Sequence, residues 1–184
     1  LFLNEIAKPD ARDWYHLPPS GIDWHAAATA PLPDGCKLLA SADLGFVELH
    51  PEMAAAFDEA VKVFDGLGAQ IVEVRKLFDD PVDIFKTLWY SGAAFLLGAL
   101  PEEQFAALDP GLQAIVLEGK QISRLDYQNA AKAREAFGSA MRQTMDGYHG
   151  LLTPQLPIPA FEVGANYPGG PDNTKPGAGS WESW

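Results

Sequence analysis

A strand–helix–strand pattern at residues 37–76 constrains the fold of this chain more than any other feature. Its first strand is a short apolar run that ends before Gly45, and a run of this length suits a buried strand. A helix is expected to begin at Pro51, because proline fits the first helical position, and to end at Gly68. The β-branched run after Gly68 predicts a second strand. Two strands joined by such a helix pair in parallel, so the pattern predicts an α/β fold.

The helix inside this pattern has one apolar face. Its apolar side chains recur every three or four residues, which is the spacing of one side of an α-helix. They are Met53, Phe57, Ala60, Phe64 and Leu67. We therefore expect this face to pack against the predicted sheet.

Three further regions precede or follow this unit, which spans residues 36–77, along the sequence. Residues 1–35 are rich in Pro, Gly and Asp, which favour turns, and predict a loop-rich lead-in. Residues 80–149 are expected to be helical. Residues 150–184 begin with a short apolar run, a predicted strand that proline stops, and continue as an irregular tail.

Capping residues mark three helix starts in the helical region. Asp80 and Asp109 each precede a proline, and Ser123 with Asp126 resembles a capping box. The first of these helices is apolar on most sides, so we expect deep burial of Ile84, Leu88, Trp89, Phe95 and Leu96. The last helix carries a face at three-to-four spacing, made of Tyr127, Ala130, Arg134, Phe137, Met141, Met145 and Tyr148.

Charge and composition exclude several classes of function. The net charge of −12 opposes binding to nucleic acid and to anionic membranes. The longest apolar stretch, residues 93–100, is too short to span a bilayer. A single cysteine, Cys36, excludes an internal disulfide, and the histidines stand too far apart to form a metal-binding motif. No metal and no cofactor are expected.

The chain contains no motif for covalent catalysis. It has no Gly-Xaa-Ser-Xaa-Gly elbow, no Ser-Xaa-Xaa-Lys and no Gly-Ser-rich loop, so no catalytic residue is assigned. Gly169-Gly170 is interpreted as a turn, and Asp79-Asp80 as a helix cap. Trp89 and Tyr90 lie on an apolar helix, where their spacing suits core packing as well as a ligand pocket.

Five stretches, in order along the chain, resemble landmarks of the amidase-signature family. One is similar to the family's Gly-Pro-Asp segment, and another to its Leu-Leu-Thr-Pro-Thr strand. The stretches are residues 7–18, 43–52, 67–69, 122–134 and 151–160. Family members use a Ser–Ser–Lys triad within a Gly-Ser-rich signature, and this signature is absent here. The resemblance therefore implies that residues 1–184 are a single segment downstream of the catalytic signature.

The resemblance carries expectations about fold and function. It implies a mixed β-sheet flanked by helices, within a cytoplasmic amidase that hydrolyses small-molecule carboxamides through a serine acyl-enzyme. The expected partner is the remainder of the amidase chain, and the segment alone is expected to be inactive. Trp89 and Tyr90 stand where family members place aromatic pocket residues. Gln155 stands where the family usually has threonine, and completes the set of substrate-binding candidates.

Two other interpretations stay open. One is the glutaminase subunit of a tRNA-dependent amidotransferase, although residues 90–97 carry no charge that could hold an amino acid. The other is a non-catalytic α/β binding module. A Gly-Ser-Ser-Gly-like stretch encoded before Leu1 would distinguish the enzyme from the module. A sheet that lacks its neighbouring strands leaves an edge and apolar area exposed, so self-association into a homo-oligomer is also expected.

Overall fold

The computed structural model describes residues 2–160 and residue 163. The chain divides into two compact units, residues 1–35 and 36–184. The first unit contains two short helices, α1 (Phe2–Ile6) and α2 (Trp24–Thr29). Asn4 joins them, because its amide group donates a hydrogen bond to Asp23 and its side-chain oxygen accepts one from the Trp24 N–H. The turn-rich composition did not predict these helices.

The second unit is built on a three-stranded parallel sheet. Its strands are β1 (Lys37–Ala40), β2 (Gln70–Glu73) and β3 (Gly150–Leu152), in the order β2-β1-β3. Leu39, at the centre, is level with Val72 on one side and Leu151 on the other. Helix α3 (Pro51–Gly66) connects β1 to β2. The predicted parallel β-α-β unit is therefore confirmed, and so is the α/β class.

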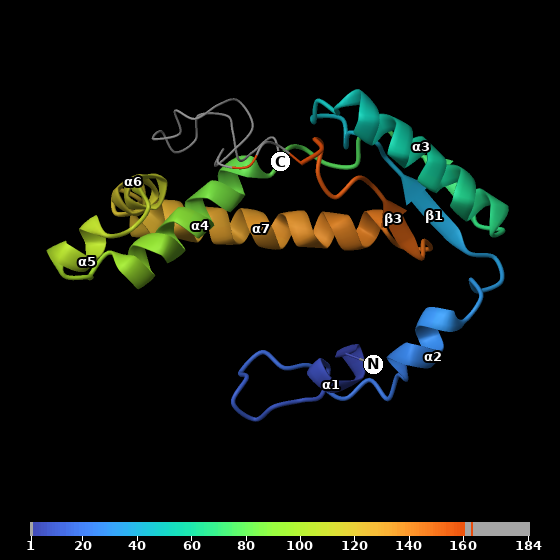
Figure 1. Cartoon of the computed structure of the whole chain (residues 1–184), viewed down its shortest axis with the longest axis horizontal. Helices are drawn as coiled ribbons and strands as arrows, with labels where there is room; N and C mark the ends of the chain where they lie inside the picture. The colour runs from blue at the N-terminus through green and yellow to red at the C-terminus, as the bar shows by residue number, and fades with distance from the viewer. Residues whose placement is uncertain (1, 161–162, 164–184) are drawn as a thin grey trace. The chain divides into compact units, whose positions relative to one another are not determined.

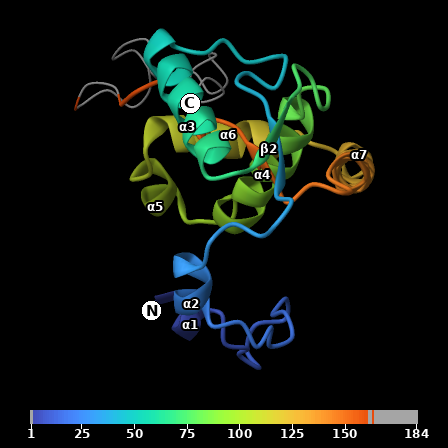
Figure 2. The same cartoon turned by 90° about the vertical axis from the view of Figure 1, so that its right-hand side faces the viewer.

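β1 forms the centre of the core in this unit. Leu38, Leu39 and Ala40 are buried, and so are Cys36 and Ser41 at its two ends. Figures 1 and 2 show the sheet between α3 and the long helix α7 (Arg124–Thr144). Three strands give only a narrow surface on which these helices can pack.

Helix α3 begins and ends where its sequence predicts. The side chain of His50 accepts a hydrogen bond from the Glu52 N–H, Pro51 is the first residue, and Gly68 follows the end with a φ of +91°. Its apolar face differs in detail from the prediction. Met53, Phe57 and Phe64 are half-buried together with Val61, whereas Ala60 and Leu67 are exposed. The half-buried residues recur at spacings of four, four and three, so the covered face of the helix is shifted toward Val61 and away from Ala60.

Four helices lie between β2 and β3. They are α4 (Val82–Leu97), α5 (Glu102–Ala106), α6 (Pro110–Gly119) and α7. The Asp109 cap and the Ser123–Asp126 capping box are both present. Helix α4 begins one residue later than predicted, after Pro81, although the Asp80 side chain still accepts a hydrogen bond from the Val82 N–H.

The expected deep burial of α4 is wrong for this chain. α4 packs on α6 and α7, and its one fully buried residue is Tyr90. The rest of its surface includes an exposed group that we name the α4 apolar face. It comprises Phe85 (46% exposed), Trp89 (50%), Phe95 (84%) and Leu96 (73%). The physical reason is that two helices cover only one side of an element that is apolar on most sides.

Some sequence predictions fall outside the described residues. These are the Gly169-Gly170 turn and the irregular tail from residue 164 onward. Within residues 2–160 and 163, no helix is long and apolar enough to cross a membrane. The same residues contain no cluster of His, Cys, Asp and Glu suited to hold a metal ion.

Candidate functional site

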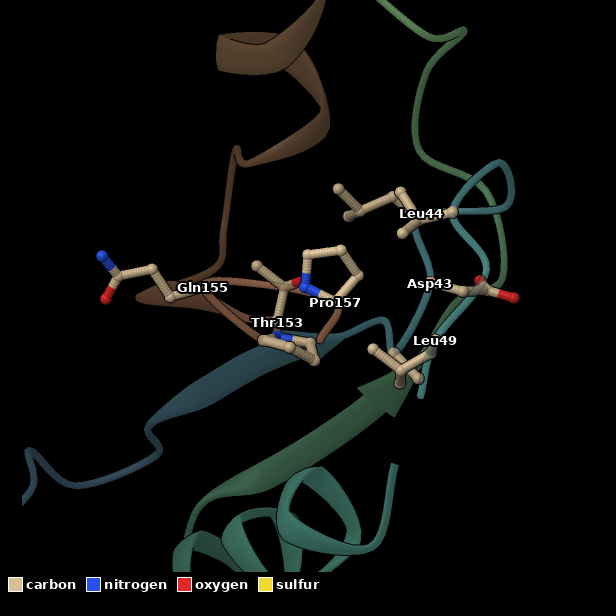
Figure 3. A pocket seen from close by; sticks show the side chains of 9 residues that line it. Asp43, Leu44, Leu49, Thr153, Gln155 and Pro157 are labelled. Atoms are coloured by element: carbon tan, nitrogen blue, oxygen red, sulfur yellow. The ribbon is translucent and has the colours of Figure 1, made fainter. Parts of the chain in front are cut away.

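A hollow of about 120 Å³ lies beyond the carboxyl ends of β1 and β3 (Figure 3). Open α/β sheets bind ligands at this edge, where the loops that follow neighbouring parallel strands diverge. β1 and β3 are neighbours in space although β2 lies between them in sequence. The lining residues come from the two loops after these strands. They are Ala42, Asp43, Leu44, Val47, Leu49, Thr153, Pro154, Gln155 and Pro157.

Ser41 fixes the loop that follows β1. This residue is buried, and its N–H continues the sheet by donating to the Leu152 carbonyl oxygen at 3.0 Å. Its hydroxyl donates to the Arg75 carbonyl oxygen at 3.3 Å and accepts from the Leu44 N–H at 3.1 Å. One side chain therefore connects the turn after β1 to the segment after β2.

The turn itself uses two left-handed residues in succession, Leu44 with a φ of +54° and Gly45 with a φ of +83°. The Asp43 carboxylate accepts a hydrogen bond from the Gly45 N–H at 2.8 Å, which closes the turn. A Cβ atom on Gly45 would lie 2.8 Å from the Cβ of Lys76, so this position requires glycine for space as well as for φ. A left-handed leucine costs about 1–2 kcal/mol, and such strain concentrates at functional sites.

Contacts between three phenylalanine rings also support the loop after β1. The Phe46 and Phe78 rings are 5.8 Å apart between centroids, and Phe78 meets Phe137 of α7 edge-to-face at 4.9 Å. Pairs in this geometry contribute about 0.5–1.5 kcal/mol beyond their buried area. The loop after β1 is thereby attached to the loop after β2 and to α7.

The loop after β3 forms the opposite wall. Pro157 is connected to the start of α3, because its carbonyl oxygen accepts the His50 N–H at 2.9 Å. Thr153 and Pro157 face Leu44 and Leu49 across the hollow, whereas the amide of Gln155 points away from it (Figure 3). The two walls therefore present mainly apolar surface to one another.

The lining of the hollow is mainly apolar and carries few polar groups. Asp43 is the one ionisable residue among the nine lining residues, and none of the nine is Ser, Cys, Lys, Arg or His. Covalent amide hydrolysis needs a nucleophile with a base beside it. Thr153 brings a hydroxyl group to a largely apolar surface, whereas the Asp43 carboxylate and the Gln155 amide point away from the hollow (Figure 3).

The three predicted substrate-binding residues lie in different environments. Gln155 lines the hollow. Trp89 is on the α4 apolar face, where its ring stacks on Phe85 at 6.0 Å and 17°. Tyr90 is 2% exposed, on the side of α4 that contacts Gly119. Neither Trp89 nor Tyr90 lines the hollow, so the structure does not gather the three residues into one site, and their roles stay predictions.

Sequence reasoning missed Leu44 and Leu49 as lining residues. A signal was present, because Asp43-Leu44-Gly45 directly follows the first predicted strand of a parallel pair. Residues at that position lie at the carboxyl edge of the sheet, where ligands bind.

The second unit has an α/β fold with a parallel sheet and a hollow at the carboxyl edge of that sheet. Solved amidases are similar to this chain in fold. A crystal structure of an amidase matches with a TM-score of 0.63 and 22% identity, over 77% of this chain and 33% of the other. A bacterial aryl acylamidase of the amidase-signature family matches with a TM-score of 0.59 and 18% identity, over 72% of this chain and 30% of the other.

The amino-acid sequence is also similar to that of an acylamidase. An acylamidase from Rhodococcus erythropolis is 26% identical over 165 residues, which is 89% of this chain and 34% of the acylamidase. No protein-family model matches the chain. The chain is thus similar in sequence to an acylamidase and in fold to two solved amidases, and it spans about a third of the length of these proteins.

Proposed function

We infer that this chain is part of an amidase that hydrolyses the C–N bond of non-peptide carboxamides, and that the catalytic residues lie outside residues 1–184. The observation that carries this inference is the match to the acylamidase over 89% of the chain. The shared fold of the solved amidases supports it independently of sequence.

The chemistry proposed for the whole enzyme is a serine acyl-enzyme reaction. A serine hydroxyl adds to the amide carbonyl, the C–N bond breaks, and ammonia or an amine leaves with a proton. Water then adds to the acyl ester, which releases the carboxylate and regenerates the serine. The nine residues that line the hollow contain no such nucleophile, which fits the absence of the Gly-Ser-rich signature.

The role proposed for this chain is to supply part of the substrate wall. The hollow beyond the carboxyl ends of β1 and β3 supports this role, because open α/β sheets bind ligands at that edge. Gln155 borders it, and we propose that Trp89 and Tyr90 contribute to substrate binding from α4 within the larger protein. The remainder of the amidase chain is the proposed partner.

Hydrolysis of simple aryl amides by the purified 184-residue protein tests the absence of a nucleophile. The expected result is no turnover above the rate without protein. If turnover is seen, each serine within residues 2–160 is replaced by alanine in turn, beginning with the buried Ser41. Activity that one serine variant abolishes would identify a nucleophile in this chain and overturn the assignment of catalysis to another segment.

A further inference from the structure

The loop that joins α1 to α2 in the first unit carries three highly exposed apolar side chains. We name residues 7–23 the aromatic loop, which leaves α1 and returns to α2 (Figure 1). In this loop Trp14 is 90% exposed, Tyr15 is 86% exposed and Leu17 is 80% exposed. Tryptophan and tyrosine are enriched among the residues that carry most of the binding energy of protein interfaces. The aromatic loop is therefore suited to dock on an apolar surface.

Hydrogen bonds hold the aromatic loop in shape. Asn4 links α1 to α2 and so closes the base of the loop. The Asp10 carboxylate accepts the Arg12 N–H at 2.9 Å. The Asp13 carboxylate accepts the Tyr15 N–H, also at 2.9 Å, and both bonds close turns of a kind that aspartate side chains favour. A loop that is already ordered loses less conformational entropy when it docks.

The α4 apolar face offers a surface of matching chemistry. One stripe of this helix holds residues at spacings of four, three and four, namely Phe85, Trp89, Gly92 and Leu96. Apart from its chain neighbours and the α4 backbone, no described atom lies within 4 Å of the Cβ position of Gly92. The stripe therefore has open space between the Trp89 and Leu96 side chains, which a ring from another molecule can enter.

Charge limits where two copies of this chain can touch, because each copy carries a net charge of −12. Residues 14–22 of the aromatic loop and residues 87–101, which include most of α4, contain no Asp, Glu, Lys or Arg. A contact between these two stretches removes no charged side chain from water, so it avoids the cost of burying an unpaired charge. The two surfaces are thus compatible with one another within an acidic protein.

The available area indicates how many such contacts a stable pair needs. An aromatic side chain can bury about 150–250 Å², so the three apolar residues of the loop can bury about 400 Å² against a similar area of α4. One contact then totals about 800 Å², which is no larger than a crystal-packing contact. Two contacts related by a twofold axis total about 1,600 Å², the size of a standard stable interface.

We propose that two copies of this chain form a closed pair, in which the aromatic loop of each copy docks on the α4 apolar face of the other. Trp14 and Tyr15 supply the rings, and the space beside Gly92 receives one of them. The occupant of the α4 apolar face is thus a second copy of the same chain. This pairing goes beyond amide hydrolysis and does not depend on it.

Sedimentation velocity of the 184-residue protein tests the pair. A wild-type dimer is expected at about 10 μM, because interfaces of this size have Kd values from about 1 μM downward. The loop variant combines Trp14→Ser with Tyr15→Ser, and the face variant combines Phe95→Lys with Leu96→Lys. Each variant should weaken pairing at least about tenfold, because each removes both contacts of the pair.

Two matched controls change exposed apolar residues outside the two surfaces. Phe2→Ser replaces a 76% exposed aromatic residue of α1, and Leu125→Lys replaces a 69% exposed leucine of α7. Both controls should leave the Kd of the pair unchanged. Circular dichroism should show the same helix content in all of these proteins, since every substituted residue is exposed.

A mixture of the loop variant and the face variant distinguishes loop-to-face docking from a contact between like surfaces. The loop of the face variant and the α4 apolar face of the loop variant are both intact, so one of the two contacts can still form in a mixed pair. We expect mixed dimers at a concentration at which neither variant pairs alone. A contact between like surfaces would not be restored by mixing.

Four results would overturn the proposal. A wild-type protein that is monomeric at about 100 μM would leave the α4 apolar face to another segment of the amidase. A loop variant that pairs as tightly as the wild type would show that the aromatic loop is not in the interface. A mixture that stays monomeric would exclude loop-to-face docking. A mass that keeps increasing beyond two copies as concentration rises would indicate an open chain of molecules instead of a closed pair.

Discussion

Gly119 of α6 lies directly against the backbone of Tyr90 in α4: a Cβ atom on Gly119 would stand 2.1 Å from the Tyr90 carbonyl oxygen. The two helices therefore approach more closely than any residue with a Cβ atom at position 119 would allow. This contact orients α4, buries Tyr90 and leaves the α4 apolar face exposed on another side.

Gly119→Ala is expected to destabilise the protein by about 1–3 kcal/mol, because α4 and α6 must separate to admit the methyl group. Gly92→Ala is the matched control, since Gly92 lies within α4 and has nothing within 4 Å of its Cβ position. That control should stabilise the helix by about 0.5–1 kcal/mol. Chemical denaturation of the two variants measures both effects, and similar unfolding midpoints would contradict the close contact.

Phe64→Ala and Leu67→Ala test the orientation of α3. Phe64 is half-buried, whereas Leu67 is 62% exposed beyond the end of the helix. Phe64→Ala should cost about 1–3 kcal/mol, below the range for a fully buried phenylalanine, and Leu67→Ala less than about 0.5 kcal/mol. Thermal melts compare them. A larger loss at Leu67 would mean that the helix is rotated from the position described.

The capping box of α7 gives a pH-dependent prediction. Hydrogen bonds from the Ser123 side chain and then from its backbone N–H hold the pKa of the Asp126 carboxyl below its usual value. A lowered folded-state pKa stabilises the fold above the unfolded pKa, and this contribution is lost as pH falls through the folded pKa. Ser123→Ala should raise the Asp126 pKa toward the ordinary aspartate value of about 3.9. A carboxyl-carbon NMR titration measures it, and an unchanged pKa would show that the side-chain hydrogen bond is not formed in solution.

Local sequence signals predicted the parts of the fold that depend on neighbouring residues. Pro51 and Gly68 bound α3 as expected, and the Ser123–Asp126 capping box is present. The exposure of Phe95 could not be predicted, because apolar periodicity shows which side chains avoid water but not which segment of polypeptide covers them. The hollow escaped prediction for a related reason. It depends on Leu44 and Thr153, which face each other across the hollow from loops far apart in sequence, and no local pattern contains that pairing.

The α4 apolar face should make the isolated protein self-associate and bind hydrophobic dyes, because exposed aromatic and aliphatic side chains promote both. Phe95→Lys and Leu96→Lys should reduce both effects, and a lysine near the carboxyl end of a helix is compatible with its dipole. Val63→Lys, at a 59% exposed position in the last turn of α3, is the control. Light scattering and dye fluorescence report the result. A monodisperse wild-type protein that binds no dye would favour an independent module over a segment of a larger enzyme.

We propose that this chain is the non-catalytic segment of an amidase. The most direct test of this proposal compares hydrolysis of benzanilide by the 184-residue protein with hydrolysis by the parent polypeptide extended upstream of Leu1. We expect no turnover by the first and steady turnover by the second, abolished when a serine upstream of Leu1 is replaced by alanine. Turnover by the 184 residues alone, or an extended protein that binds amides without cleaving them, would contradict it.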